Sequence, residues 1–151
     1  MGRALIVEAD GGSRGNPGIA GYGALVVDVD SHELLAQRAA PLGKASNNVA
    51  EYQSMIAGLL ASEVIDAGAE VTVRMDSRLV IEQMAGRWKI NHADMQRLAR
   101  EAQEIVRRLR AAGGSVTWTW IPREQNKAAD KLSNVGMDGN QIECDFWRLV
   151  L

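Results

Sequence analysis

The hydrophobic pattern of this chain changes between strand-like and helical spacing in a particular order. This order constrains the fold more than any other feature. Strand-like segments come first, at residues 4–10, 22–29 and 33–40, and the short polar link between the last two predicts an antiparallel meander. Helical and strand-like patterns follow, with strands at 70–76 and 115–122 and helices at about 48–64, 77–85, 93–112 and 126–137. A meander followed by crossovers predicts an α/β fold. We expect a mixed five-stranded sheet, three strands antiparallel and then two parallel, with helices on both faces.

Length and charge limit the class of protein. A chain of 151 residues is most simply one domain, and its net charge of −2 argues against a protein that is basic as a whole. A local cationic groove can still coexist with an acidic site. No apolar run approaches the roughly 20 residues that span a bilayer. The first residues lack a signal-peptide pattern, and the single Cys144 cannot form an internal disulfide. We therefore expect a cytoplasmic protein without membrane contact.

Glycines follow the first strand in the stretch GGSRGNPG, residues 11–18. A phosphate-binding loop requires a helix after such glycines, whereas the strand-like segment YGALVVDV follows here, and neither common phosphate-loop spacing is present. We interpret the stretch as a tight turn with bare backbone. It would let a large ligand approach Asp10 and contact Gly11 and Gly12.

Four acidic residues stand at the ends of strands or the beginnings of helices: Asp10, Glu51, Asp76 and Asp130. If the first and fourth strands are central and parallel, these residues meet at one sheet edge. Clustered carboxylates repel one another unless cations neutralise them, and oxygen ligands favour Mg²⁺ or Mn²⁺. Two such ions form a clamp for in-line displacement at phosphorus. Glu8 alternates onto the same strand face as Asp10 and could add another acid.

Each acid also has a simpler interpretation. Glu51 could complete a capping box with Asn48, and Asp76 could cap the helix that begins at Ser77. Asp130 could be a solvated surface acid, and Asp10 could stabilise the glycine turn through its side chain.

Four segments together resemble type 1 ribonucleases H: EADGGSRGNPG (8–18), SNNVAEY (46–52), RMDSRLVIEQM (74–84) and WIPREQNKAADKLSN (120–134). The resemblance covers about residues 4–138. It implies a ribonuclease H-like domain at 1–138, with residues 139–151 as a tail that is packed on the domain or extended. It is strongest to compact bacterial forms, including the N-terminal domain of actinobacterial proteins that carry a phosphatase-like second domain.

The resemblance implies a monomeric endonuclease that hydrolyses the RNA strand of an RNA–DNA hybrid and leaves 5′-phosphate and 3′-hydroxyl ends. It implies two Mg²⁺ ions, with Mn²⁺ as a substitute, bound by Asp10, Glu51, Asp76 and Asp130. Amide side chains suit recognition of the RNA 2′-hydroxyl because they both donate and accept hydrogen bonds. The positions that match family contacts to substrate are Asn16, Lys44, Ser46, Asn47, Asn48, Asn91 and Asn126.

Two departures from the family pattern stand out. The short segment GRWKINHAD replaces the basic helix and loop that well-known members carry between the second and third helices. Arg123 stands where a histidine often lies near the metals. Arginine keeps its charge and offers a planar fork for phosphate, so we expect it to attract the scissile or leaving phosphate without shuttling protons.

Three other functions stay open at this point. A catalytically weak hybrid-binding module of the same fold would keep the fold without turnover. A nuclease or integrase-type enzyme of this fold would act on DNA, although the asparagine set argues against it. A third possibility is a partner-binding domain that docks another protein through a helical face around Leu98 and Ile105.

Overall fold

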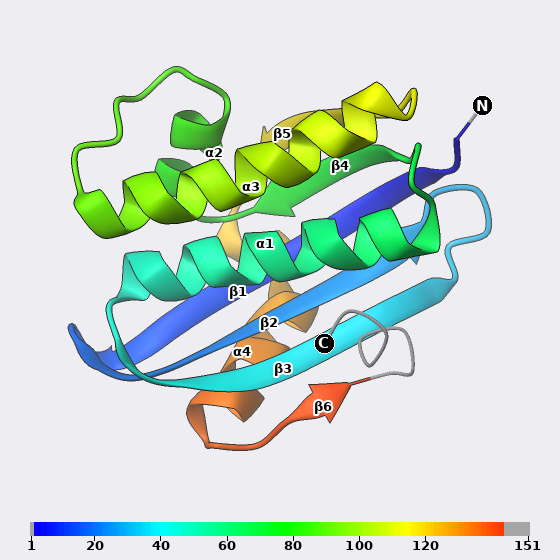
Figure 1. Ribbon diagram of the computed structural model, residues 1–151. Helices are drawn as coiled ribbons and strands as arrows, with labels where there is room; N and C mark the ends of the chain where they lie inside the picture. The colour runs from blue at the N-terminus through cyan, green and yellow to red at the C-terminus, as the bar shows by residue number, and fades with distance from the viewer. Residues whose placement is uncertain (1, 144–151) are drawn as a thin grey trace.

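The computed structural model describes residues 2–143 as a single sheet with helices on both faces (Figure 1). The strands lie in the order β5-β4-β1-β2-β3-β6. Their bounds are β1 Ala4–Gly15, β2 Gly18–Asp28, β3 Leu34–Ala45, β4 Glu70–Met75, β5 Ser115–Trp120 and β6 Ile142–Glu143. The helices are α1 Asn47–Ile65, α2 Arg78–Met84, α3 Ala93–Ala111 and α4 Lys127–Met137, with a short 3-10 helix η1 at Arg123–Gln125.

The strand pairing confirms the mixed sheet. β1, β2 and β3 form the antiparallel meander, whereas β4 pairs parallel to β1 and β5 pairs parallel to β4. The expected count of five strands is wrong, because β6 pairs antiparallel with β3 at Arg38 and Ala39. A two-residue strand shows no periodicity in the sequence, so only its pairing reveals it. The division of the chain at residue 138 stays a prediction, and residues 144–151 of the expected tail lie outside the described part of the chain.

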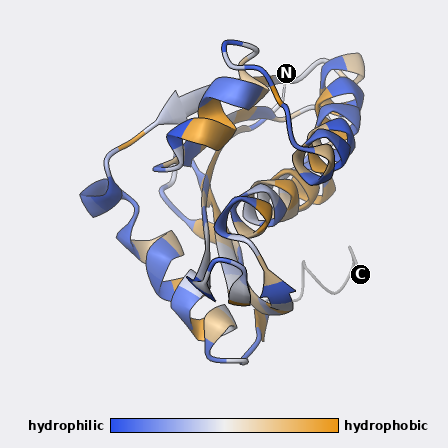
Figure 2. Cartoon of the chain, turned by 90° about the vertical axis from the view of Figure 1, so that its left-hand side faces the viewer, coloured by the Kyte–Doolittle hydropathy of each residue, from blue (hydrophilic) through white to orange (hydrophobic). Residues whose placement is uncertain are grey.

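α1 and α3 cover one face of the sheet side by side (Figure 1), and α4 covers the other. α1 packs on β1 and on α3, α3 also contacts β5, and α4 contacts β1, β2 and β3. α1 is apolar over much of its circumference because it packs against both the sheet and α3, whereas α3 is hydrophilic on its outer side (Figure 2). Leu98 and Ile105 are buried in the core, so the proposed docking face around them is wrong. Among the described residues, no helix is long and apolar enough to cross a membrane.

The glycine-rich stretch differs from its prediction. β1 continues through Gly15, and the turn to β2 contains only Asn16 and Pro17. A Cβ atom on Gly11 would lie 2.3 Å from the backbone carbonyl of Ala50 in α1. The bare backbone of Gly11 therefore serves the close approach of α1 to β1. This packing brings Glu51, the next residue of α1, beside β1 at Gly11.

Gly11→Ala should destabilise the protein by about 1–3 kcal/mol, because its new methyl group meets backbone atoms that cannot rotate away. Gly12→Ala is the matched control, since a Cβ there meets only the flexible Met137 side chain, at 3.2 Å. Urea unfolding of both variants measures the difference. Equal midpoints for the two variants would contradict the packing role of Gly11.

Candidate active site

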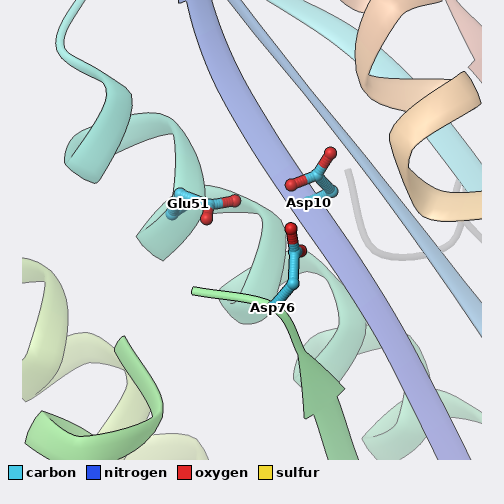
Figure 3. A group of neighbouring side chains, drawn as sticks. All are labelled: Asp10, Glu51 and Asp76. Carbon is cyan, nitrogen blue, oxygen red and sulfur yellow. The ribbon is translucent and has the colours of Figure 1, made fainter. Parts of the chain in front are cut away.

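Three carboxylates from three elements converge at one edge of the sheet (Figure 3). Asp10 lies on β1, Glu51 on α1, and Asp76 directly after β4. Each offers a ligand oxygen, and these oxygens lie within 4.8 Å of one another. Asp10 is only 8% exposed. The parallel pairing of β1 with β4 produces this meeting, because its last pair is Glu8 with Arg74, and Asp10 and Asp76 each follow two residues later.

The contacts of Glu51 and Asp76 exclude their simpler interpretations as caps. Ser46 is the N-cap of α1, so Asn48 and Glu51 do not form a capping box. Glu51 Oε1 instead accepts a hydrogen bond of 2.5 Å from the backbone N–H of Gly11. Ser77 caps α2 through its own hydroxyl, so Asp76 is free of that task.

Asp130 and Arg123 belong to the same pocket. Asp130 lies in the first turn of α4, and its Oδ1 is 3.9 Å from Nη2 of Arg123. Both residues line a pocket of about 440 Å³ together with the three clustered acids. The charge of Asp130 contributes to the raised pKa of Asp10, so Asp130 is electrostatically part of the site rather than an isolated surface acid.

Burial and mutual repulsion make the cluster electrostatically unfavourable without a cation. Burial raises the pKa of Asp10 to about 7; a hydrogen bond with Glu51 opposes this shift, and the charge of Asp76 adds to it. Burial, and then the charge of Asp10, raise the pKa of Glu51 well above its ordinary value. A divalent cation would relieve both effects, and a donor set made only of carboxylate oxygens suits a hard ion. The residues present therefore fit a divalent metal.

Glu8 lies outside this cluster. Its Oε2 is 3.6 Å from Nη1 of Arg74 on the neighbouring strand β4. The group of acids that can share an ion among the described residues forms without it.

Three of the predicted substrate residues, Asn16, Asn47 and Asn48, lie around the N-terminus of α1. Asn47 Oδ1 accepts a hydrogen bond of 2.7 Å from Ser13 N–H, and Asn16 Oδ1 accepts one of 3.2 Å from Asn47 N–H. Asn47 and Asn48 line the acidic pocket together with Gly11 and Gly12. These contacts bring the turn between β1 and β2 together with the start of α1.

A second pocket, of about 600 Å³, lies on the other side of the α1 N-terminus. Its lining includes Asn16, Lys44, Ser46 and Asn48. Ser46 also accepts a hydrogen bond of 3.2 Å from Val49 N–H as the helix cap. Asn91 is exposed and does not line this pocket, whereas the next residue, His92, and also Arg97 do. Asn48 lines both pockets and so connects the acidic site with this one.

Arg14 was not predicted as a pocket residue, and the position of Asn126 differs from its predicted contact with substrate. Arg14 lines the acidic pocket and forms an ion pair of 2.6 Å with Asp138, at the C-terminal end of α4. Alternation along an extended β1 would have placed Arg14 on the face of Asp10, but the expected turn at Gly11 hid this signal. Asn126 is 1% exposed and bonds to protein atoms, so its predicted contact with substrate has no exposed surface to act through.

Comparisons of sequence and fold with known proteins identify the family of this chain. Residues 8–136 match the family model described as reverse transcriptase-like. The bifunctional protein Rv2228c of Mycobacterium tuberculosis is 47% identical over 135 residues, which are 89% of this chain and 35% of that protein. The solved N-terminal RNase H domain of Rv2228c superposes with a TM-score of 0.82, covering 90% of this chain and 94% of that one. The chain belongs to the type 1 ribonuclease H family.

Further members of the family extend the comparison. The ribonuclease H of Paracoccus denitrificans is 32% identical, over 89% of this chain and 92% of that protein. LC11-RNase H1, solved in complex with an RNA/DNA hybrid, is 34% identical with a TM-score of 0.81, over 89% of this chain and 96% of that one. This ribonuclease H chain spans about a third of the length of Rv2228c, so any activity of a longer protein is a separate question.

Proposed function

We propose that this chain is an endonuclease that hydrolyses the RNA strand of RNA–DNA hybrids and leaves 5′-phosphate and 3′-hydroxyl ends. The observation that carries the proposal is the convergence of Asp10, Glu51 and Asp76 within 4.8 Å, in a pocket that asparagines also line. Membership of the ribonuclease H family supports it, and so does the similarity to LC11-RNase H1, whose structure contains an RNA/DNA hybrid.

The four acids would have different roles, according to their positions. Asp10 and Asp76 would hold two Mg²⁺ ions, for which Mn²⁺ can substitute. Glu51 would position one ion and the 2′-hydroxyl, and Asp130 would complete the site of the other. When bound, the ions supply charge neutralisation and an activated water for in-line attack at phosphorus. Burial of Asp10 strengthens these electrostatic interactions because little water competes for the carboxylate.

The asparagines and the second pocket would distinguish the two strands. Asn16, Asn47 and Asn48 would read the 2′-hydroxyls of RNA, which act both as donors and as acceptors. Lys44, Ser46 and Asn91 would bind a phosphate of the DNA strand. The arrangement supports this division because Asn48 lines both pockets, so one hybrid can contact both.

Cleavage of labelled RNA–DNA hybrid, duplex RNA and duplex DNA tests the function, in Mg²⁺ and in EDTA. We expect cleavage of the RNA strand of the hybrid alone, and only with metal. Hybrid binding without cleavage would instead indicate a catalytically weak binding module. Cleavage of duplex DNA would indicate a DNA nuclease of the same fold.

We also propose that the domain acts as a monomer in the cytoplasm. In a longer protein it would be joined to a phosphatase-like domain; the name "bifunctional protein" for its relative Rv2228c supports a second fused function. Size-exclusion chromatography with light scattering measures the first property. The genomic reading frame that contains the chain decides whether a second domain follows.

Arg123→Ala should lower turnover about tenfold, on the order of 1.4 kcal/mol, without abolishing cleavage. Arg123 lines the acidic pocket, and its side chain can reach a phosphate because it is 81% exposed despite the 3.9 Å ion pair with Asp130. Arginine keeps its charge across the neutral range, so the pH–rate profiles of parent and variant should have the same shape. Steady-state kinetics from pH 6 to 9 measures both properties.

Glu124→Ala, in the same short helix η1, is the control for a general disturbance of this loop. Arg123→Lys keeps the charge but loses the planar fork, so it should fall between the parent and Arg123→Ala. An unchanged rate in Arg123→Ala would show that this residue lies in solvent without a catalytic task. A pH–rate profile of Arg123→Ala that gains or loses an ionisation near pH 6–7, compared with the parent, would contradict the proposed contact of Arg123 with phosphate.

A further inference from the structure

The buried side chain of Asn126 forms hydrogen bonds to two of the strands that carry the acidic cluster. Its side-chain Nδ2 donates two hydrogen bonds, one of 2.9 Å to the carbonyl oxygen of Ala9 and one of 2.8 Å to Oδ1 of Asp76. Ala9 directly precedes Asp10 on β1. One amide group therefore joins the middle of β1 to the end of β4, beside the acid that each strand presents.

The backbone of Asn126 connects the same group to a third acid. Its carbonyl oxygen accepts a hydrogen bond of 3.0 Å from the N–H of Asp130, in the first turn of α4. Asn126 thus contacts the segments that carry Asp10, Asp76 and Asp130. The fourth acid, Glu51, is fixed separately by the N–H of Gly11.

The chemistry of the neighbours decides which end of the amide faces them. A backbone carbonyl and an ionised carboxylate only accept hydrogen bonds, so the NH₂ group must face Ala9 and Asp76. The amide oxygen of Asn126 is buried and has no hydrogen-bond partner within residues 2–143. A buried acceptor without a donor costs stability. The unpaired amide oxygen of Asn126 therefore costs stability, whereas its NH₂ group is well suited to orient a carboxylate.

We propose that Asn126 is a positioning residue that orients Asp76 and holds the end of β4 beside β1 at Ala9 for binding of the divalent metal. This inference rests on the proposed nuclease function for its kinetic consequences, but not for its effect on metal binding. The bond to Oδ1 restricts rotation of the Asp76 carboxylate. Partners of this kind change metal affinity or activity by about 10- to 100-fold when they are removed.

Calorimetric titration of the metal-free protein with Mg²⁺ alone tests the proposal first. Asn126→Ala should bind Mg²⁺ at least tenfold more weakly than the parent. Ile105→Val is the control for lost stability, since Ile105 is buried in α3 away from the acids and should keep the parental affinity. Thermal unfolding in EDTA confirms that all variants are folded. Parental Mg²⁺ affinity in a folded Asn126→Ala would overturn the proposal.

Kinetics on the hybrid separate positioning from direct substrate contact. A residue 1% exposed does not reach the substrate, so Asn126→Ala should lower kcat by 10- to 100-fold and leave KM unchanged. If Asn126→Ala instead raised KM and kept the parental kcat, Asn126 would contact the substrate directly, and the positioning role would be overturned. Asn126→Asp keeps the size but loses both donors. It should lose at least as much kcat as Asn126→Ala, and parental kcat in Asn126→Asp would contradict a role as donor.

The two readouts distinguish failure of this inference from failure of the proposed function. If the parent binds Mg²⁺ but cleaves no hybrid, the nuclease function fails, and weaker Mg²⁺ binding by Asn126→Ala still supports positioning. If the parent cleaves the hybrid and a folded Asn126→Ala matches it in both Mg²⁺ affinity and kcat, the function stands and the positioning role fails.

Discussion

Asp10→Asn and Asp76→Asn should each reduce cleavage of the hybrid to background, a loss of at least about 10³-fold or roughly 4 kcal/mol of transition-state stabilisation. Each substitution removes a negative ligand oxygen from the group of three within 4.8 Å. The side chain keeps nearly the same size, so the fold should remain. Single-turnover cleavage in Mg²⁺ measures the loss, and circular dichroism verifies the fold.

Glu8→Gln is the matched control, because Glu8 is an acid on the same strand that pairs with Arg74 outside the cluster. It should retain cleavage. Asp10→Asn should also unfold at a higher temperature than the parent in EDTA, since it removes one of the repelling charges. Normal turnover by Asp10→Asn or Asp76→Asn with unchanged metal content would refute the assignment of these acids.

The metal-free protein should become less stable as the pH rises from 5 to 8. In the unfolded chain Asp10 ionises near 3.8, whereas in the folded protein its pKa is about 7. Between these values the folded state binds the extra proton, so the stabilisation is present at low pH and is lost as the pH rises through 7. The difference amounts to at most roughly 4 kcal/mol for Asp10, and the raised pKa of Glu51 acts in the same direction.

Thermal unfolding in EDTA and in Mg²⁺, at pH 5 and pH 8, measures this dependence. Mg²⁺ should raise the unfolding temperature far more at pH 8 than at pH 5, because the ion binds the ionised acids and competes with their protons. Asp10→Asn should show a smaller decline with pH in EDTA. An unfolding temperature in EDTA that rises between pH 5 and pH 8 would contradict the repulsion within the cluster.

Local patterns in the sequence predicted the main elements of the fold and the acids of the site. Period-two and helical runs predicted the five longer strands and the four α-helices of residues 2–143, because one buried face leaves a regular apolar repeat. The acids could be selected because each stands at the end of a predicted strand or near the start of a predicted helix, although the structure places Asp10 inside β1 and Glu51 just beyond the first turn of α1. Where periodicity was absent, as at the two residues of β6, the prediction failed.

The tertiary structure alone decided how the site is held. The N–H of Gly11 meets Glu51 across 40 positions of sequence, and Asn126 meets Asp76 across 50 and Ala9 across 117. No local repeat contains such pairs, since they depend on how α1 and α4 pack against the two faces of the sheet. The same packing explains why Gly11 must lack a side chain, which the sequence suggested for a different reason. The sequence thus determined which groups can do the chemistry, and the packing of distant elements determined how those groups are oriented.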